Sequence, residues 1–249
     1  FDLDQSGGKM NLQLNKGSAE FPGVFENPRL AFDTFQTQVD WRIQNGQINV
    51  TLPRLRFRND DVEGEVSIDW HTYNQATGAE RFPGVMDLKG RIVKARAERG
   101  VRYLPLSIGR EALDYIGHAV RSGDIHNARV HIQGDLDLVP FGKNAQGVQP
   151  AGTFRFDVPL RNAEFAFVPR YLQKPSEKPW PTLQQLNGTL VFDKDSLSVL
   201  NATGRFSTSA DVAIHNLAAH IPKLGDDLVV GLAAQLRGPL DQTLQVTNQ

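Results

Sequence analysis

The sequence predicts an all-β protein with antiparallel strands and one short helix. Apolar and polar residues alternate in many short segments, polar turns separate these segments, and only one stretch has helical periodicity. Alternation with a period of two places apolar side chains on one face of a strand and polar side chains on the other. Many such strands joined by polar turns are typical of an antiparallel sheet.

The stretch from Leu186 to Gly204 shows the strand pattern most clearly. Apolar residues and glycine occupy every second position up to Phe192, the turn at residues 193–196 is wholly polar, and Leu197 starts a return strand. The same alternation recurs along the chain in the segments Met10–Leu14, Val39–Ile43, Ile48–Leu52, Val66–Trp70, Met86–Ile92, Val130–Leu138, Phe154–Leu160, Phe165–Phe167, Val212–Ile214 and Leu228–Leu236.

One helix is predicted over residues 109–120. Leu113, Ile116 and Val120 recur at positions i, i+3 and i+7, so they lie on one helical face, and Ser107 is a suitable N-cap. A helix of this length spans about 18 Å. It is too short to cover the apolar face of so many strands, and the sequence therefore raises the question of what covers the rest.

Glycines fall on the apolar side of several predicted strands. Gly64, Gly90, Gly134, Gly188 and Gly204 share the parity of their apolar neighbours. Glycine inside a strand marks a bend, a bulge or the close approach of another group. One interpretation is a curved sheet whose concave side is kept roomy. The other is that these are turn residues at strand starts that fall on this parity by chance.

Composition excludes several classes of function. The net charge is -1, so no overall field favours nucleic acid. The chain has no cysteine, which excludes disulfides, thiol catalysis and cysteine-ligated zinc. No stretch approaches the ~20 apolar residues of a membrane-spanning helix. The histidine pairs do not have the spacing that places two ligands on one face, so no metal site is predicted.

Few side chains could carry chemistry. Asp135 and Asp137 share the polar face of a predicted strand and could mimic a glycosidase pair, although such carboxylates are more often simply solvated. Arg54, Arg56 and Arg58 alternate along another strand and fit a solvated face, a nucleic-acid edge or a rim that meets lipid phosphates. We predict no catalytic residues and no cofactor, and a glycan-acting enzyme is the weakest alternative.

The segment from Arg102 to Phe141 carries motifs of a known family. Tyr103-Leu104-Pro105 precedes the predicted helix, a Gly-Asp-Ile-His-Asn-Ala run follows it at residues 123–128, and Val139-Pro140-Phe141 closes the segment. Trp180-Pro181 lies downstream. Together these motifs resemble the AsmA-like envelope proteins of Gram-negative bacteria, of the YhdP type, in which the closing element is usually Phe-Pro-Phe.

The resemblance covers Gly84 to Phe206 best. It implies a bridge-like lipid transfer protein, in which a twisted, curved antiparallel β-sheet forms an open hydrophobic groove, apolar inside and polar outside. It also implies a parent chain that is anchored to the inner membrane, crosses the periplasm and passes phospholipid between the inner and outer membrane. Residues 1–249 would then be one continuous, non-enzymatic segment of a repetitive β-groove, truncated at both ends.

On this interpretation, phospholipid acyl chains cover the apolar face. The expected groove lining consists of Leu88, Ile92, Val130, Ile132, Leu136, Leu138, Phe154, Phe156, Val158, Leu186, Leu190 and Phe192. The helix, through Leu113, Ile116 and Val120, would gate the groove or cap part of its face. The alternative function is a closed β-sandwich or barrel that binds carbohydrate or protein, with its apolar face sealed against itself.

Overall fold

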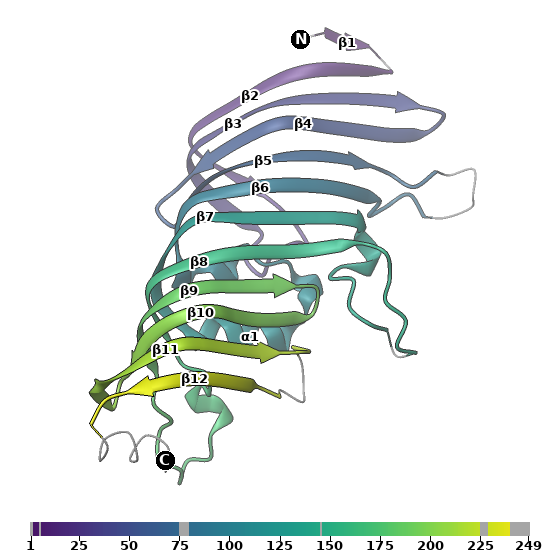
Figure 1. Cartoon of the computed structure of the whole chain (residues 1–249). Coiled ribbons are helices and arrows are strands. Elements are labelled where there is room, and N and C mark those ends of the chain that lie inside the picture. Colours follow the sequence, from purple (N-terminus) through teal and green to yellow (C-terminus); the bar gives the residue numbers. More distant parts are fainter. Residues whose placement is uncertain (1, 5, 75–79, 145, 225–228, 240–249) are drawn as a thin grey trace.

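The computed structural model describes residues 2–4, 6–74, 80–144, 146–224 and 229–239. Within these ranges the chain forms one antiparallel sheet of 12 strands, and each strand pairs with the next in sequence (Figure 1). The sheet is open, with β1 and β12 at its edges. The predicted all-β architecture with an open antiparallel sheet is confirmed, and the alternative of a closed sandwich or barrel is wrong.

The elements follow one another without long helical insertions. The strands are β1 (Asp2–Asp4), β2 (Gly7–Glu20), β3 (Arg29–Gln44), β4 (Gln47–Arg58), β5 (Val62–His71), β6 (Val85–Arg96), β7 (Val120–Asp135), β8 (Thr153–Phe165), β9 (Leu183–Asp193), β10 (Ser196–Phe206), β11 (Ser209–Ile221) and β12 (Gly231–Arg237). The helical elements are η2 (Ala97–Tyr103), η3 (Leu106–Ile108), α1 (Arg110–Ala119), η4 (Leu136–Leu138) and η5 (Arg170–Leu172). None of the helices in the described ranges is long and apolar enough to span a membrane.

Bulges bend the strands so that the sheet curves around α1 (Figure 1). Asn127, Asn162, Gln185, Asn201 and Asn216 have positive φ angles between 47° and 56° inside β7 to β11, and the pairing registers shift there. Asparagine tolerates the left-handed region better than most residues, because its short side chain hydrogen-bonds locally. Each bulge adds one residue to its strand and bends it.

The bulges also keep the apolar side chains on one face of the sheet. A nearly fully buried side chain follows each left-handed residue directly: Ala128, Ala163, Leu186, Ala202 and Leu217, all 0–2% exposed. Because the extra residue shifts the alternation by one, Leu160 and Ala163 on either side of the bulge in β8 are both buried. After this shift β8 continues to Phe165, which is its last residue. The separate strand predicted from the alternation of Phe165 with Phe167 is therefore wrong.

The glycines on the apolar side allow close approach and do not leave free space. A Cβ at Gly188 would lie 2.7 Å from the Cβ of Ala202, and a Cβ at Gly90 would lie 2.6 Å from Cγ1 of Val66. Neighbouring side chains therefore fill the space beside these glycines. The interpretation as a curved sheet is correct, but the expectation of a roomy concave side is wrong at these two positions.

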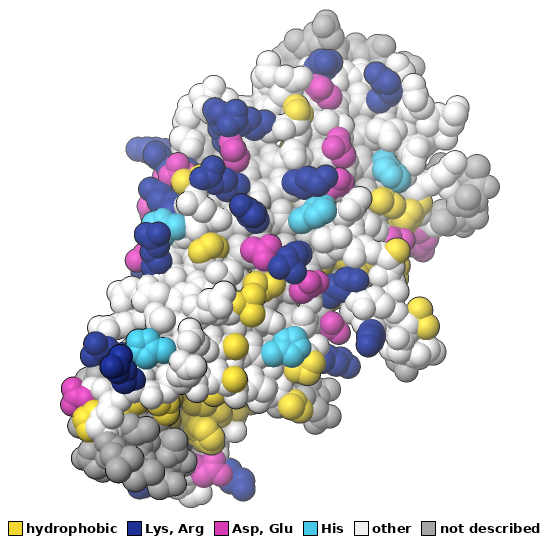
Figure 2. Space-filling model, in the orientation of Figure 1, with side chains coloured by type: hydrophobic (Ala, Val, Ile, Leu, Met, Phe, Trp, Pro, Cys, Tyr) yellow, Lys and Arg dark blue, Asp and Glu magenta, His cyan; other side chains and the backbone are white. Residues whose placement is uncertain are grey.

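Charged side chains lie on the outer, convex face. Arg54 Nη2 is 2.6 Å and Arg56 Nε is 3.8 Å from Oε2 of Glu65 on the neighbouring strand, and Lys94 Nζ is 3.3 Å from Oε2 of Glu63. The hydrogen bond from Arg54 lowers the pKa of the Glu65 carboxyl. Figure 2 shows basic and acidic side chains interspersed on this face. Two of the alternating arginines thus belong to a solvated, ion-paired surface.

α1 is one residue shorter at each end than the predicted helix over residues 109–120. Its N-cap is Gly109, without a side-chain hydrogen bond, because Ser107 lies inside η3 and is not free to cap the helix. At the other end Val120 is already the first residue of β7. The helix therefore runs into the strand without a linker.

Candidate functional site

The inner, concave face of the sheet carries apolar side chains in rows that run from strand to strand. Followed through the Cα pairings, one row contains Leu55, Val66, Gly90, Val130, Phe156, Phe192, Leu197 and Ile221, and another contains Leu52, Ile68, Leu88, Ile132 and Phe154. Side chains at paired positions point to the same face of a sheet. These rows define the concave face.

The concave face contains most of the predicted lining residues. They are Leu88, Ile92, Val130, Ile132, Phe154, Phe156, Val158, Leu186, Leu190 and Phe192. Phe154, Leu186, Leu190 and Phe192 are buried, and the other six are half-buried. Their position on one apolar face agrees with the sequence pattern, whereas their contact with lipid stays a prediction.

Leu136 and Leu138 do not continue β7, as their alternation predicts, but form η4. The Asp135 carboxylate accepts a hydrogen bond from the backbone N–H of Asp137 at 3.0 Å, and this bond starts a tight turn. Tyr73 donates a second hydrogen bond to the same carboxylate. Leu138 is 46% exposed as a result. Asp135 and Asp137 therefore hold a turn together and do not share a strand face.

Exposure divides the concave face into two stretches. The open stretch, in β5 to β8, consists of half-buried side chains: Val66, Leu88, Val130, Ile132 and Phe156. The closed stretch, in β9 to β11, consists of side chains only 4–8% exposed: Leu190, Phe192, Leu197, Val199 and Ile221. In the row of Phe156 the change falls between β8 and β9, because Phe156 is half-buried and its Cα partner Phe192 is 5% exposed. In other rows it falls one strand earlier, since Phe154 and Leu160 of β8 are already buried.

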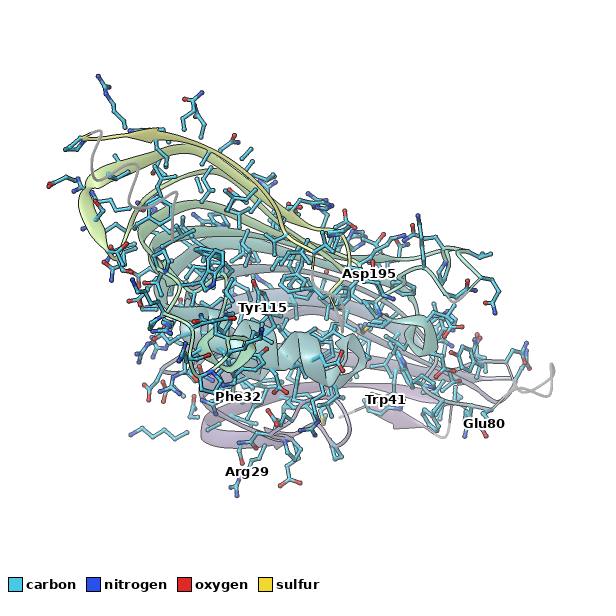
Figure 3. The ribbon with its side chains drawn as sticks, turned by 90° about the horizontal axis from the view of Figure 1, so that it is seen from below. Arg29, Phe32, Trp41, Glu80, Tyr115 and Asp195 are labelled. Carbon is cyan, nitrogen blue, oxygen red and sulfur yellow. The ribbon has the colours of Figure 1, made fainter. Side chains whose placement is uncertain are left out.

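α1 contributes side chains to the core that contains the closed stretch. Tyr115 and Ile116 belong to the same buried cluster as Phe192. Figure 3 shows α1 on the inner side of the curved sheet, with Arg29 and Glu80 at the periphery. Of the predicted helix-face residues, Leu113 and Ile116 are buried, and Val120 is half-buried in β7.

Sequence reasoning missed Tyr115, which is 2% exposed. Its signal was present, because Ala112, Tyr115 and Ala119 recur at positions i, i+3 and i+7 and all are buried. Alanine is only weakly apolar, so this line gives a weaker periodic signal than the neighbouring line through Leu113 and Ile116. Together the two lines form the broad buried face expected of a helix that packs on a sheet.

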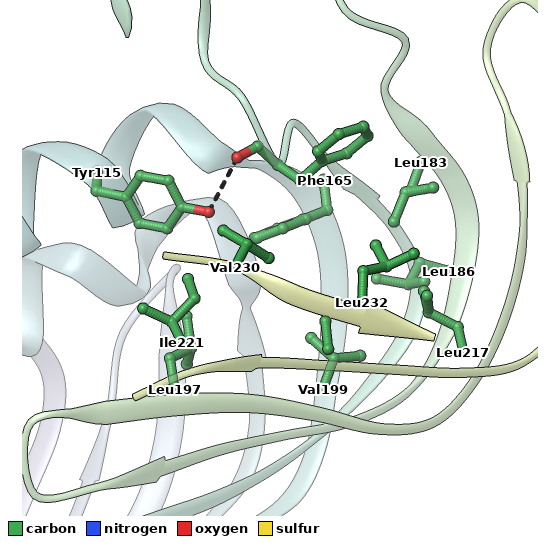
Figure 4. A pocket seen from close by; sticks show the side chains of 12 residues that line it. Tyr115, Phe165, Leu183, Leu186, Leu197, Val199, Leu217, Ile221, Val230 and Leu232 are labelled. Atoms are coloured by element: carbon green, nitrogen blue, oxygen red, sulfur yellow. Dashed lines mark hydrogen bonds between the residues drawn. The ribbon is translucent and has the colours of Figure 1, made fainter. Parts of the chain in front are cut away.

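An apolar pocket lies between α1 and the closed stretch (Figure 4). Its empty space is about 440 Å³ when open solvent is counted, and its lining is almost entirely hydrocarbon. Tyr115 and Phe165 line one side, and Leu197, Val199 and Ile221 are among the residues that complete it. Burial raises the pKa of Tyr115 to about 12, because the ionised phenolate is disfavoured away from water.

Two polar-tipped side chains on the concave face, and Tyr115 on α1, direct their donors to the backbone. Thr37 Oγ1, Trp70 Nε1 and Tyr115 Oη donate hydrogen bonds of 3.0, 2.8 and 3.2 Å to the carbonyls of Gln38, Pro83 and Phe167, respectively. In the described ranges no three His, Cys, Asp or Glu side chains gather into a group that could hold a metal ion. The chemistry of this face is that of a hydrocarbon surface.

Comparison with known proteins gives one consistent result. The chain is 26% identical over 239 residues to the intermembrane phospholipid transporter YhdP of Escherichia coli (strain K12), an alignment that covers 93% of this chain and 16% of that protein. This chain thus spans about one sixth of the relative's length. No solved structure matches. The family model described as YhdP protein matches residues 1–249, and the chain therefore belongs to the YhdP family.

Proposed function

We propose that the concave face shields and conducts phospholipid acyl chains. The observation that carries this proposal is the open stretch, whose apolar side chains are half-buried on a sheet that does not close on itself. Leaving such a surface in water is unfavourable, and covering it with hydrocarbon gains about 25 cal/mol per Å² of apolar area. The name of the E. coli relative, an intermembrane phospholipid transporter, supports the choice of ligand.

A hydrocarbon face suits movement better than tight binding. Each acyl methylene that leaves water gains ~0.8 kcal/mol, wherever it lies along the face. The donors of Thr37, Trp70 and Tyr115 are already engaged with backbone carbonyls, so they offer no fixed point to a head group. A lipid can therefore keep its tails on the concave face and its head group in solvent, and slide from row to row at little cost.

The cellular setting follows from the same proposal. We place this chain in the periplasm, as a non-enzymatic part of a longer protein that is anchored to the inner membrane. Its partners would be phospholipid and, through the rest of the parent chain, the inner and outer membranes. Groove-lining roles are assigned to the ten predicted residues that lie on the concave face, from Leu88 in β6 to Phe192 in β9.

Two neighbouring residues on β5 test the proposal. Ile68 lies on the concave face opposite Leu88, whereas Ser67 lies on the outer face opposite Lys89, and both are half-buried. In the full-length parent protein, lipid crosslinking to a photoreactive residue at Ile132 should be lost with Ile68→Asp, because a carboxylate in the row repels hydrocarbon. Ser67→Asp, which faces a lysine, should leave crosslinking unchanged.

Thermal unfolding of both variants is measured as a control, to check that each remains folded. Equal loss of crosslinking in two folded variants would show that the faces are not distinguished by lipid. Absence of any crosslinked lipid in the unmodified protein would refute the proposed function itself.

A further inference from the structure

We propose that α1 is a gate between the open and the closed stretch, and that the Tyr115 hydroxyl is its latch. This gate presupposes the proposed function, because it has a role only if lipid moves along the concave face. The structure identifies the element that has to move and the bond that holds it. A uniform hydrocarbon surface would have neither a moving element nor a bond that holds it.

α1 lies next to η2, η3 and β7, and its side chains belong to the cluster that contains the buried end of the row of Phe156. Phe156 and Phe192 are Cα partners on β8 and β9, and their ring centroids are 6.5 Å apart. Phe192 is buried in one cluster with Tyr115 and Ile116 of α1, and Phe156 is half-buried and packs against the same cluster. Tyr115 of the helix thus faces the closed stretch across the apolar pocket, on the side from which a ligand would approach.

An acyl chain gains access to more of the closed stretch when the helix moves. The side chains there are 8% exposed or less, so they offer almost no surface to a ligand. If Tyr115 and Ile116 swing outward, acyl methylenes can replace their contacts and cover the apolar area that opening exposes. Lipid therefore binds the open gate better than the closed one, which is the differential affinity that a population shift requires.

α1 is held firmly at its C-terminal end and loosely at its N-terminal end. Val120 continues directly into β7, and the N–H of Ala166 donates to the carbonyl of Ala119 at 2.7 Å. At the other end Gly109 has φ 93°, its helix end lacks a side-chain cap, and a Cβ there would meet nothing within 4 Å. Glycine in open space at positive φ is a suitable pivot.

The latch ties the middle of the helix to the segment that follows β8. Tyr115 Oη donates to the carbonyl of Phe167 at 3.2 Å, and the tyrosine is 2% exposed (Figure 4). The opposite side of α1 carries the exposed residues Arg110, Asp114 and His118. These side chains remain in water whether the helix is docked or swung out, so movement requires no burial of charge.

The first test compares lipid on the two sides of the gate. Photoreactive residues are placed separately at Ile132, in the open stretch, and at Leu232, which is 53% exposed and lines the pocket beyond α1. In the full-length protein, Tyr115→Phe should raise lipid crosslinking at Leu232 roughly fivefold, which corresponds to one net hydrogen bond of about 1 kcal/mol. Crosslinking at Ile132 should not change, and the control Tyr171→Phe should affect neither probe.

The second test locks the gate reversibly. An added Cβ at Gly117 would lie 3.8 Å from Cγ2 of Val101 in η2, which brings these positions within reach of a disulfide. The chain has no cysteine, so Gly117→Cys with Val101→Cys creates a single pair. η2 follows β6 directly and Ala97 anchors it in the core. Oxidation should remove crosslinking at Leu232 only, and reduction should restore it.

Equal crosslinking at Leu232 in the oxidised and the reduced protein would overturn the gate, because lipid would then pass a fixed helix. So would an unchanged signal at Leu232 in Tyr115→Phe. Failure of the underlying function has a different signature, namely no lipid at either Ile132 or Leu232 in any form of the protein.

Discussion

Phe156 and Phe192 allow a direct comparison of how tightly the open and the closed stretch are packed. Both are phenylalanines on the concave face, they are Cα partners in β8 and β9, and their rings meet at an interplanar angle of 74°. They differ in burial, since Phe192 is 5% exposed and Phe156 is half-buried. Replacing each with alanine removes the same atoms from two different surroundings.

The two replacements should differ in their cost to the free energy of unfolding. Truncation of Phe192 leaves a cavity inside a packed cluster and should cost about 3–5 kcal/mol. Truncation of Phe156 loses only part of the transfer term, because its ring already touches water, and should cost about 1–2 kcal/mol. The contact between the two rings is lost in both variants, so it cancels from the comparison.

Urea unfolding of lipid-free protein measures both values, provided that the m-value is unchanged. Bound phospholipid should then stabilise wild type and Phe192→Ala by similar amounts and Phe156→Ala by less, because a ligand stabilises in proportion to its binding to the native state. Equal destabilisation by the two substitutions in lipid-free protein would refute the division into open and closed stretches. It would mean that the protein's own packing seals the whole face.

Two further predictions concern the latch and the bulges. Burial raises the pKa of Tyr115 from 10.0 to about 12, so the unfolded state loses its proton first; the stability that the neutral hydroxyl contributes is fully present below pH 10 and is lost between pH 10 and 12. Between pH 10 and pH 12, the free energy of unfolding measured in urea should therefore fall by about 2–3 kcal/mol less in Tyr115→Phe than in wild type. An equal fall in the two proteins would contradict this. Asn201, at φ 50° in β10, should tolerate Asn201→Gly, whereas Asn201→Val should cost roughly 1–2 kcal/mol in the same assay; equal stability of the two variants would show that the bulge carries no strain.

The alternation of side chains was enough to predict an antiparallel sheet, because the period of two is a local property of a strand. It also placed residues such as Ile132 and Phe156 on the same face. It failed at Leu136 and Leu138, where alternation continues into a 3-10 turn. The reason is that one hydrogen bond, from the Asp137 N–H to the Asp135 carboxylate, outweighs the pattern.

The bulges leave a signal in the sequence. Asn127, Asn162 and Asn201 are each followed by an alanine, and each interrupts an alternating run whose parity changes by one. A residue that tolerates positive φ before a small residue fits a bend, because the inner side of a bend is crowded. What the sequence could not supply is the distance that separates the two arms of the bent sheet, because this depends on the packing of α1.

Under the proposed function, the position of α1 bears on where the rate of lipid movement is set. Along the open stretch the rows offer hydrocarbon, and the donor of Trp70 in β5 is engaged with the backbone, so no position there holds a lipid much more tightly than the next. Flux along a path of nearly equal sites is limited by its highest barrier. In the row that runs from Val66 to Ile221, exposure falls at the step from Phe156 to Phe192. Control would therefore reside in the free energy that docks α1, and one hydroxyl at Tyr115 would affect transport more than an exchange of Leu for Ile in the lining.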